Sequence, residues 1–248
     1  MSLSRFISAA ILGLGSLAAV SGVSFADTFH VSTLGPGVQS SPDSTSVNTF
    51  TGFTGTTNFN GSSITGTYSG DYVLKPADIY GGANGTGQYP FQDWNQAMTI
   101  SLSSSVNYFG LWISALDAGN TIDFYDGSTL LFTFAPTDYP SLLSGCPGDA
   151  ACGNPNSDFL GANNTQKYLF FNFYDTDGTF DKIVLNELPG GFESDNHTIG
   201  NLSSDPSGTP LNPPSPVPEP STFVLGLSGL AGLVGSRHQL MARLRRSS

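Results

Sequence analysis

Between residues 98 and 185, apolar side chains recur at every second position in several short segments. Successive side chains of a β-strand point to opposite faces of its sheet, so this period of two indicates strands with one face in a core. Outside the two ends of the chain, no segment shows the period of a helix. The apolar sets are Met98, Ile100 and Leu102; Phe109, Leu111, Ile113 and Ala115; Ile122 and Phe124; Leu130, Phe132 and Phe134; and Phe180, Ile183 and Leu185.

Turn signals separate these strands. Asp126-Gly127 is typical of a tight hairpin turn. Residues 168–173 are apolar apart from Asn172, which indicates a strand covered on both faces. Weaker strand signals lie at 28–33, 47–53, 64–69 and 72–74. Many short strands with frequent turns predict an all-β fold, an antiparallel β-sandwich of jelly-roll-like connectivity.

Composition limits the classes of function. The chain has 248 residues, of which 18 are Phe and 9 are Tyr, enough aromatic surface to build a core. Segment 27–217 holds 18 acidic residues and 3 lysines, which gives a net charge of −15. A domain of that charge repels anionic polymers and attracts cations, so we expect no nucleic-acid partner.

The first residues are typical of a secretory signal peptide. Arg5 precedes an uncharged apolar stretch, and Ser24-Phe25-Ala26 is a small-x-small cleavage site. We therefore predict a signal peptide over 1–26, with the Sec machinery and signal peptidase as partners, and an exported protein.

The C-terminal end has three parts. A proline-rich stretch leads to an uncharged apolar run at 221–236, which is followed by a basic cluster of Arg237, Arg243, Arg245 and Arg246. As a helix the apolar run spans about 24 Å, somewhat less than the roughly 30 Å hydrocarbon core. Arginine can snorkel and extend that reach, and basic residues mark the cytoplasmic side. We predict a C-terminal transmembrane helix with its basic end in the cytoplasm.

Val217, Pro218, Glu219 and Pro220, ahead of this helix and the arginines, resemble the PEP-CTERM sorting signal of bacterial surface proteins. The resemblance implies a tail that an exosortase-type enzyme recognises at the Pro-Glu-Pro element and processes. It also implies transient anchoring in the inner membrane and delivery to the cell surface or extracellular matrix. Bacteria with such proteins usually make exopolysaccharide.

The middle of the chain, roughly 90–200, resembles a subfamily of these exosortase-dependent surface proteins, and this second resemblance implies no catalytic residue. The phrases that carry it are Phe109–Trp112, Asp117–Asn120, Gly153–Asn156 and Gly191–His197. The domain organisation that we expect is a signal peptide at 1–26, a β-sandwich at 27–199, a linker at 200–217 and a sorting tail at 218–246.

Cys146 and Cys152 lie close together in a loop rich in Gly and Pro. In an exported protein this spacing favours a local disulfide. Such a bond staples the loop and contributes about 2 kcal/mol through loop entropy.

Acidic residues near a turn are candidates for calcium binding. Asp175, Asp177 and Asp181 resemble the alternating carboxylates that hold Ca²⁺, but Gly178 does not stand where an EF-hand loop needs glycine. In the alternative interpretation these side chains cap a hairpin turn.

Glu193 and Asp195, with Asn196 and His197, form a second oxygen-rich cluster, in an expected loop after the last clear strand. This cluster is a candidate for binding metal or sugar, or for hydrogen bonds that hold the chain where it leaves the domain. Calcium is the one cofactor that these two clusters suggest.

Trp94 and Tyr89 are candidates for a sugar-stacking platform, because aromatic faces bind pyranose rings through apolar contact. Trp112 lies in a strand and is expected in the core. The exported domain has only His30 and His197, with no Gly-x-Ser-x-Gly motif. We therefore expect a non-catalytic surface or matrix protein associated with exopolysaccharide. The alternative is a lectin-like carbohydrate-binding module, with or without calcium, or a carbohydrate-active enzyme.

Overall fold

The computed structural model describes residues 28–211. The predicted signal peptide 1–26, the sorting motif Val217–Pro220, the apolar helix 221–236 and the terminal arginines lie outside the described residues.

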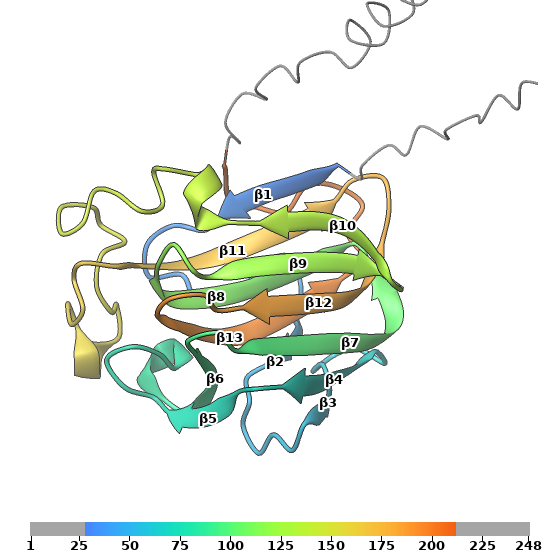
Figure 1. Ribbon diagram of the computed structural model, residues 1–248, viewed down its shortest axis with the longest axis horizontal. Coiled ribbons are helices and arrows are strands. Elements are labelled where there is room, and N and C mark those ends of the chain that lie inside the picture. Colours follow the sequence, from blue (N-terminus) through green and yellow to red (C-terminus); the bar gives the residue numbers. More distant parts are fainter. Residues whose placement is uncertain (1–27, 212–248) are drawn as a thin grey trace, which may run out of the picture.

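The strands form two sheets, and every pairing within them is antiparallel (Figure 1). Sheet A has the order β14 (Thr209–Pro210), β1 (Phe29–Thr33), β11 (Lys167–Asp175), β8 (Tyr108–Leu116), β13 (Gly191–Gly200), β6 (Gln88–Asp93) and β5 (Val73–Pro76), with β2 (Ser46–Asn48) paired to β13. Sheet B has the order β10 (Thr129–Phe134), β9 (Thr121–Asp126), β12 (Phe180–Asn186), β7 (Ala97–Val106), β4 (Thr65–Gly70) and β3 (Thr56–Asn58). The remaining elements are three short 3₁₀ turns, η1 (Ala83–Gly85), η2 (Pro136–Asp138) and η3 (Ser157–Phe159).

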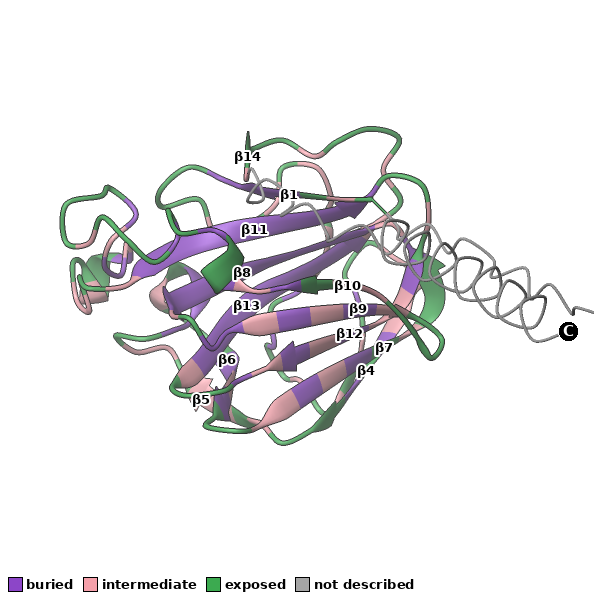
Figure 2. Ribbon diagram, turned by 45° about the horizontal axis from the view of Figure 1, so that its top comes forward, coloured by how far each residue is buried: buried purple, intermediate pink, exposed green. Residues whose placement is uncertain are grey.

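The two sheets differ in how their faces are covered (Figure 2). In β8 and β11 of sheet A every residue is buried, whereas β9 and β12 of sheet B alternate between buried and partly exposed residues. Sheet B therefore has one face in the core and one in solvent, as its period-two sequence predicts. The continuous apolar run at 168–173 belongs to β11, which is covered on both faces.

The main core lies between the sheets and is rich in phenylalanine. The ring of Phe124, from sheet B, lies 5.1 Å from that of Phe173 in sheet A and 5.0 Å from that of Phe180. The contact between Phe124 and Phe173 joins the two sheets face to face, and the contact with Phe180 fixes the Phe124 ring within sheet B.

A second cluster covers the outer face of sheet A. Trp112, Phe170 and Tyr168 belong to it, and their strand neighbours Leu111 and Phe171 face the main core. Loops close over this cluster: Asn154 Nδ2 donates to the carbonyl oxygens of Asp78 and Ile79, 3.2 Å from each. Trp112 is a core residue, as expected.

The domain continues past residue 199, the boundary expected from the sequence. Leu211 N donates to Val31 O at 2.8 Å, and β14 pairs with β1. Residues 200–211 therefore belong to the sandwich, although their Ser, Asp and Pro content is typical of a linker. Thr28 and Leu211 both line a pocket of about 530 Å³, where the described chain begins and ends.

The all-β fold with two antiparallel sheets is confirmed, and the jelly-roll connectivity stays a prediction. Sequence analysis missed β6 and the long strand β13, and it expected the acidic stretch at 193–197 in a loop. Within residues 28–211, no helix has the length and hydropathy that a membrane span needs.

Candidate functional site

Several strand ends meet at one end of the sandwich, where β8 ends, β11 and β13 begin, and β6 and β12 end (on the left in Figure 1). The registers Leu116↔Lys167, Ser114↔Glu193 and Asp93↔Gly191 bring these strands together. We call this region the loop end; it comprises residues 93–97, 116–121, 165–167 and 186–193. It contains the acidic residues Asp93, Asp117, Glu187 and Glu193.

The side-chain amide of Asn120 connects two acidic residues at the loop end. Asn120 Nδ2 donates to Glu187 Oε2 at 2.6 Å and to Gly191 O at 3.0 Å, and Asn120 Oδ1 accepts from Asp117 N at 2.8 Å. Asp117 Oδ1 accepts from Gly119 N at 2.7 Å. Each carboxylate is thus oriented through one of its two oxygens.

The other oxygen of Glu187, Oε1, is buried and has no hydrogen-bond partner among the described residues, and Glu187 as a whole is 1% exposed. Burial, followed by the nearby charge of Asp117, raises the pKa of Glu187 to about 7. Burial also raises the pKa of Asp117. The repulsion between these two like charges, one of them buried, is unfavourable unless a proton or a cation joins the pair.

Glu193 lies beside this pair and is 5% exposed. Burial raises the pKa of Glu193 to about 8, while the charge of Lys75 acts in the opposite direction. Lys75 is itself placed over the ring of Phe91, with Nζ 3.2 Å from the ring centroid.

Trp94 stands on the turn that follows β6 and is 71% exposed. The turn is fixed at both ends: Asp93 N donates to Gln96 Oε1 at 2.8 Å, and Glu187 N donates to Gln96 O at 2.9 Å. The indole is therefore an exposed aromatic surface on a backbone that is held beside the carboxylates.

Tyr89 does not join Trp94 in a platform. Its side chain is buried, and its hydroxyl donates to Asp78 Oδ1 at 2.9 Å. Tyr89 belongs to β6, a strand of sheet A, and its ring lies against Gly81 under the covering loop. The expectation of a two-residue stacking platform is wrong for this residue.

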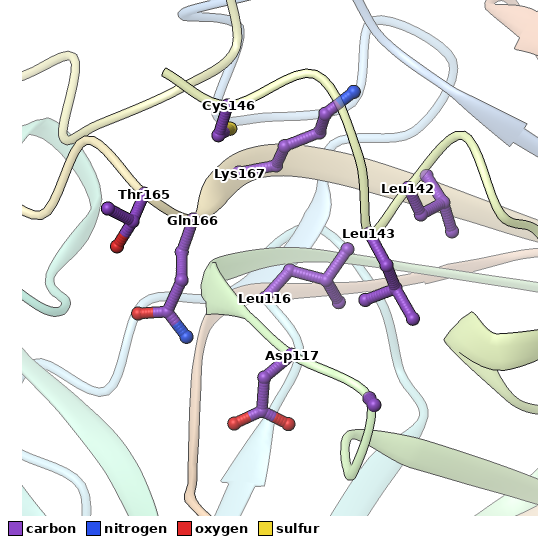
Figure 3. A pocket seen from close by; sticks show the side chains of 9 residues that line it. Leu116, Asp117, Leu142, Leu143, Cys146, Thr165, Gln166 and Lys167 are labelled. Atoms are coloured by element: carbon purple, nitrogen blue, oxygen red, sulfur yellow. The ribbon is translucent and has the colours of Figure 1, made fainter.

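A pocket of about 240 Å³ opens between the end of β8 and the loop before β11 (Figure 3). Asp117 and Gln166 line one side, and Lys167 extends away from them. The ammonium of Lys167 donates to Asp149 Oδ2 at 2.6 Å and to Ser141 O at 2.9 Å, so it does not neutralise Asp117. Hydrogen bonds from Ala151 N and from Lys167 lower the pKa of Asp149.

Cys146, also on the pocket wall, forms a disulfide with Cys152, with 5.6 Å between their Cα atoms. Asp149, which pairs with Lys167, lies in the loop that this disulfide closes. The disulfide and the ion pair therefore both hold the segment 146–152.

The three candidate calcium ligands near the turn after β11 each accept a hydrogen bond from a different backbone N–H group. Asp175 Oδ1 accepts from Gly178 N at 2.9 Å, Asp177 Oδ1 accepts from Thr28 N at 2.9 Å, and Asp181 Oδ1 accepts from Gly127 N at 2.9 Å. Each carboxylate therefore orders a separate piece of backbone, in line with the turn-capping interpretation. In the described part of the chain, no group of three or more His, Cys, Asp or Glu side chains is placed to hold a metal ion.

Glu193 and Asp195 lie in strand β13, in the middle of sheet A, rather than in a loop. Asp195 Oδ2 accepts from Ala83 N at 2.8 Å, and its burial raises its pKa to about 7. His197 Nε2 lies 2.9 Å from Ser194 Oγ, and burial lowers the pKa of His197 to about 3. The polar residues of β13 are thus satisfied inside the protein, which is why a polar sequence forms a buried strand.

Comparison with protein families adds what the described residues cannot supply. The family model for the PEP-CTERM protein-sorting motif matches residues 216–246. The chain ends in a PEP-CTERM sorting motif. The motif implies an exported protein, anchored through its C-terminus before an exosortase processes it. No curated protein and no solved structure matches the chain.

The PEP-CTERM motif begins five residues after Leu211, the last described residue. Sequence reasoning found this motif but missed the loop-end pair. Asp117 and Asn120 stand in one of the phrases of the subfamily resemblance, whereas Glu187 follows a strand without any motif. The sequence marks Glu187 only as an acidic residue after an apolar strand, and that pattern alone does not indicate a functional site.

Proposed function

We propose that this chain is a cell-surface or extracellular-matrix protein that an exosortase-type enzyme sorts, and that its sandwich contacts exopolysaccharide without turning it over. The observation that carries the proposal is the PEP-CTERM motif at 216–246. The Sec machinery and signal peptidase belong to the same proposal, through the predicted signal peptide at 1–26.

The exposed indole of Trp94 supports contact with a polysaccharide. Its apolar face is available to a pyranose ring, and the hydrogen bonds of Asp93 and Gln96 fix its turn before any ligand arrives. A preorganised contact loses less conformational freedom on binding. The net charge of −15 over 27–217 favours a neutral glycan, or an anionic one bridged by cations.

Burial at the loop end supports a non-catalytic role. The raised pKa values of Glu187 and Glu193 are a property of general acids in glycosidases, which is the observation in favour of the enzyme alternative. However, both side chains are at most 5% exposed and thus shielded from a polymer in solution. His197 is fully buried, and His30 pairs with Asp205.

Sorting is tested in the producing cell with the double variant Glu219→Ala/Pro220→Ala. We expect an unprocessed precursor in the membrane fraction, because the Pro-Glu-Pro element is removed. Ser215→Ala, outside the motif, is the control and should be processed like the wild type. Normal processing of the double variant, read by intact mass, would overturn the exosortase proposal.

Glycan contact is tested by co-sedimentation of the exported protein with the exopolysaccharide of the producing strain. Trp94→Ala should reduce the bound fraction at least tenfold, and Trp94→Phe should retain part of it. Leu160→Ala is the matched control, because Leu160 is 74% exposed and lies in another loop. Release of new reducing ends would favour the enzyme, and equal binding by Trp94→Ala would exclude the indole as the contact.

A further inference from the structure

The loop end holds a pair of inward-facing carboxylate oxygens that the proposed function does not use. Asp117 follows β8 and Glu187 follows β12, so the pair joins sheet A to sheet B. A Cβ atom at Gly190 would meet both Asp117 Oδ2 and Glu187 Oε1. A Cβ atom at Gly119 would lie 2.7 Å from Glu187 Oε1. Both oxygens therefore lie against the backbone of Gly190, and Glu187 Oε1 also lies against Gly119.

The surrounding hydrogen bonds leave one oxygen of the Glu187 carboxylate without a donor. Asp117 Oδ1 is bonded to Gly119 N, and Glu187 Oε2 is bonded to Asn120 Nδ2. Glu187 Oε1 is buried without a hydrogen-bond partner among residues 28–211. A buried acceptor left unsatisfied costs about 1–3 kcal/mol, and more when it is charged.

No basic side chain of the described region neutralises this pair. Lys167 is bonded to Asp149 and Ser141, Lys182 donates to Gly127 O, and Lys75 lies over Phe91. These lysines are the only Lys or Arg residues between 28 and 211. A proton or a cation from solution must therefore offset the negative charge of the pair.

We propose that Asp117 and Glu187 bind one calcium ion between their inward-facing oxygens, with backbone carbonyl and water oxygens completing its shell. Calcium accepts mixed oxygen ligands in flexible geometry, whereas magnesium demands a near-ideal octahedron. Asp117 is only half-buried and is followed by exposed Ala118, which gives the ion a route from solvent.

Because the ligands come from both sheets, the ion would clamp one end of the sandwich. The site differs from the acidic cluster after β11, whose oxygens already hold backbone N–H groups. It is also independent of glycan contact: a chain that binds no polysaccharide can still bind the ion.

The test is a melting curve of the exported protein after removal of metal with EDTA, then with CaCl₂ or MgCl₂ at equal ionic strength. At a calcium concentration 100 times the dissociation constant, we expect a rise in melting temperature of about 5–10 °C. The half-maximal effect should lie near 10⁻⁴–10⁻³ M, in the range of extracellular calcium modules. Magnesium should give a clearly smaller shift.

Glu187→Gln should abolish the calcium-specific shift, and in EDTA it should melt at or above the wild-type temperature because the repulsion is gone. A melting transition at or above the wild-type temperature in EDTA shows that the variant folds. Asp158→Asn makes the same charge change at an exposed position and should keep the full shift. Equal shifts with both ions, no shift, or a shift retained in Glu187→Gln would overturn the site and favour a proton shared by the pair.

Discussion

At the scale of single residues, His197 shows how this protein accommodates a polar side chain in its core. The ring is fully buried, with Phe50 at 4.9 Å in an edge-on contact and Phe109 at 5.6 Å between ring centroids. Nδ1 lies 3.3 Å from the hydroxyl of Tyr68, and Nε2 contacts Ser194. The imidazole thus serves as a core aromatic that stays neutral.

This burial predicts a loss of stability in acid. The pKa of His197 is lowered to about 3, against 6.5 for an ordinary histidine, so below pH 6.5 the unfolded chain binds a proton that the folded chain does not. The free energy of unfolding should fall with decreasing pH from this residue, by at most about 1.4 kcal/mol per pH unit, down to pH about 3.

The contribution is isolated by comparing urea unfolding of the wild type and His197→Phe between pH 7 and 4. Buried carboxylates such as Asp195, with raised pKa values, act in the opposite direction but are common to both proteins. Tyr68→Phe removes the hydroxyl partner alone and should keep the wild-type slope. Parallel pH profiles for wild type and His197→Phe would contradict the prediction.

At the scale of elements, glycines define where strands can approach one another. Gly70 ends β4 with a φ of +104°, and a Cβ atom there would run into the carbonyl oxygen of Ala97 at the start of β7. Gly127 turns the hairpin between β9 and β10 with a φ of +56°, and a Cβ atom there would have nothing within 4 Å.

We therefore expect Gly70→Ala and Gly127→Ala to differ although both remove a glycine from a left-handed conformation. Gly127→Ala should cost about 1–2 kcal/mol of unfolding free energy, from backbone strain alone. Gly70→Ala adds a backbone clash and should cost about 3 kcal/mol or more. Denaturant unfolding of the two variants measures this; equal losses would show that the strands move apart easily.

Sequence patterns predicted the strands well where apolar residues alternate or run continuously, and poorly where a buried strand is polar. The hairpin at Asp126-Gly127 and the strands of sheet B follow directly from alternating residues. β13 escaped prediction because its Glu, Asp, Asn and His side chains find partners only after loops from elsewhere fold over them, such as Ala83 N on Asp195. The proximity of Asp117 and Glu187 was not predicted for the same reason: the two residues are 70 positions apart in the sequence, and only the tertiary structure brings them together.

At the scale of the whole molecule, negative charge dominates. Residues 28–211 contain 17 acidic residues and 3 lysines, a net charge of −14. Within that range Lys167–Asp149 is the one ion pair formed by a lysine. Self-repulsion of the folded state therefore outweighs attraction between its side chains.

Salt should consequently stabilise the domain. Raising NaCl from 0.01 M to 0.15 M shortens the Debye length from about 30 Å to about 8 Å and screens repulsion between distant carboxylates. The melting temperature of the exported protein should rise over this range in EDTA, with NaCl and KCl equivalent. A fall in melting temperature would mean that local attractive pairs outweigh the net charge.

The direction of the chain at β1 and β14 has a mechanical consequence. β1 begins where β11 ends, because Phe29 pairs with Asp175. β14 runs antiparallel to β1, and Leu211 after it is bonded to Val31. At Leu211 the chain therefore points away from the loop end that carries Trp94. A domain that is anchored through its C-terminal tail and bound by a polysaccharide at Trp94, as proposed above, would be pulled along its strands. Tension that enters at Leu211 would load the pairing of β14 with β1 in shear, so that its hydrogen bonds share the load instead of opening one by one.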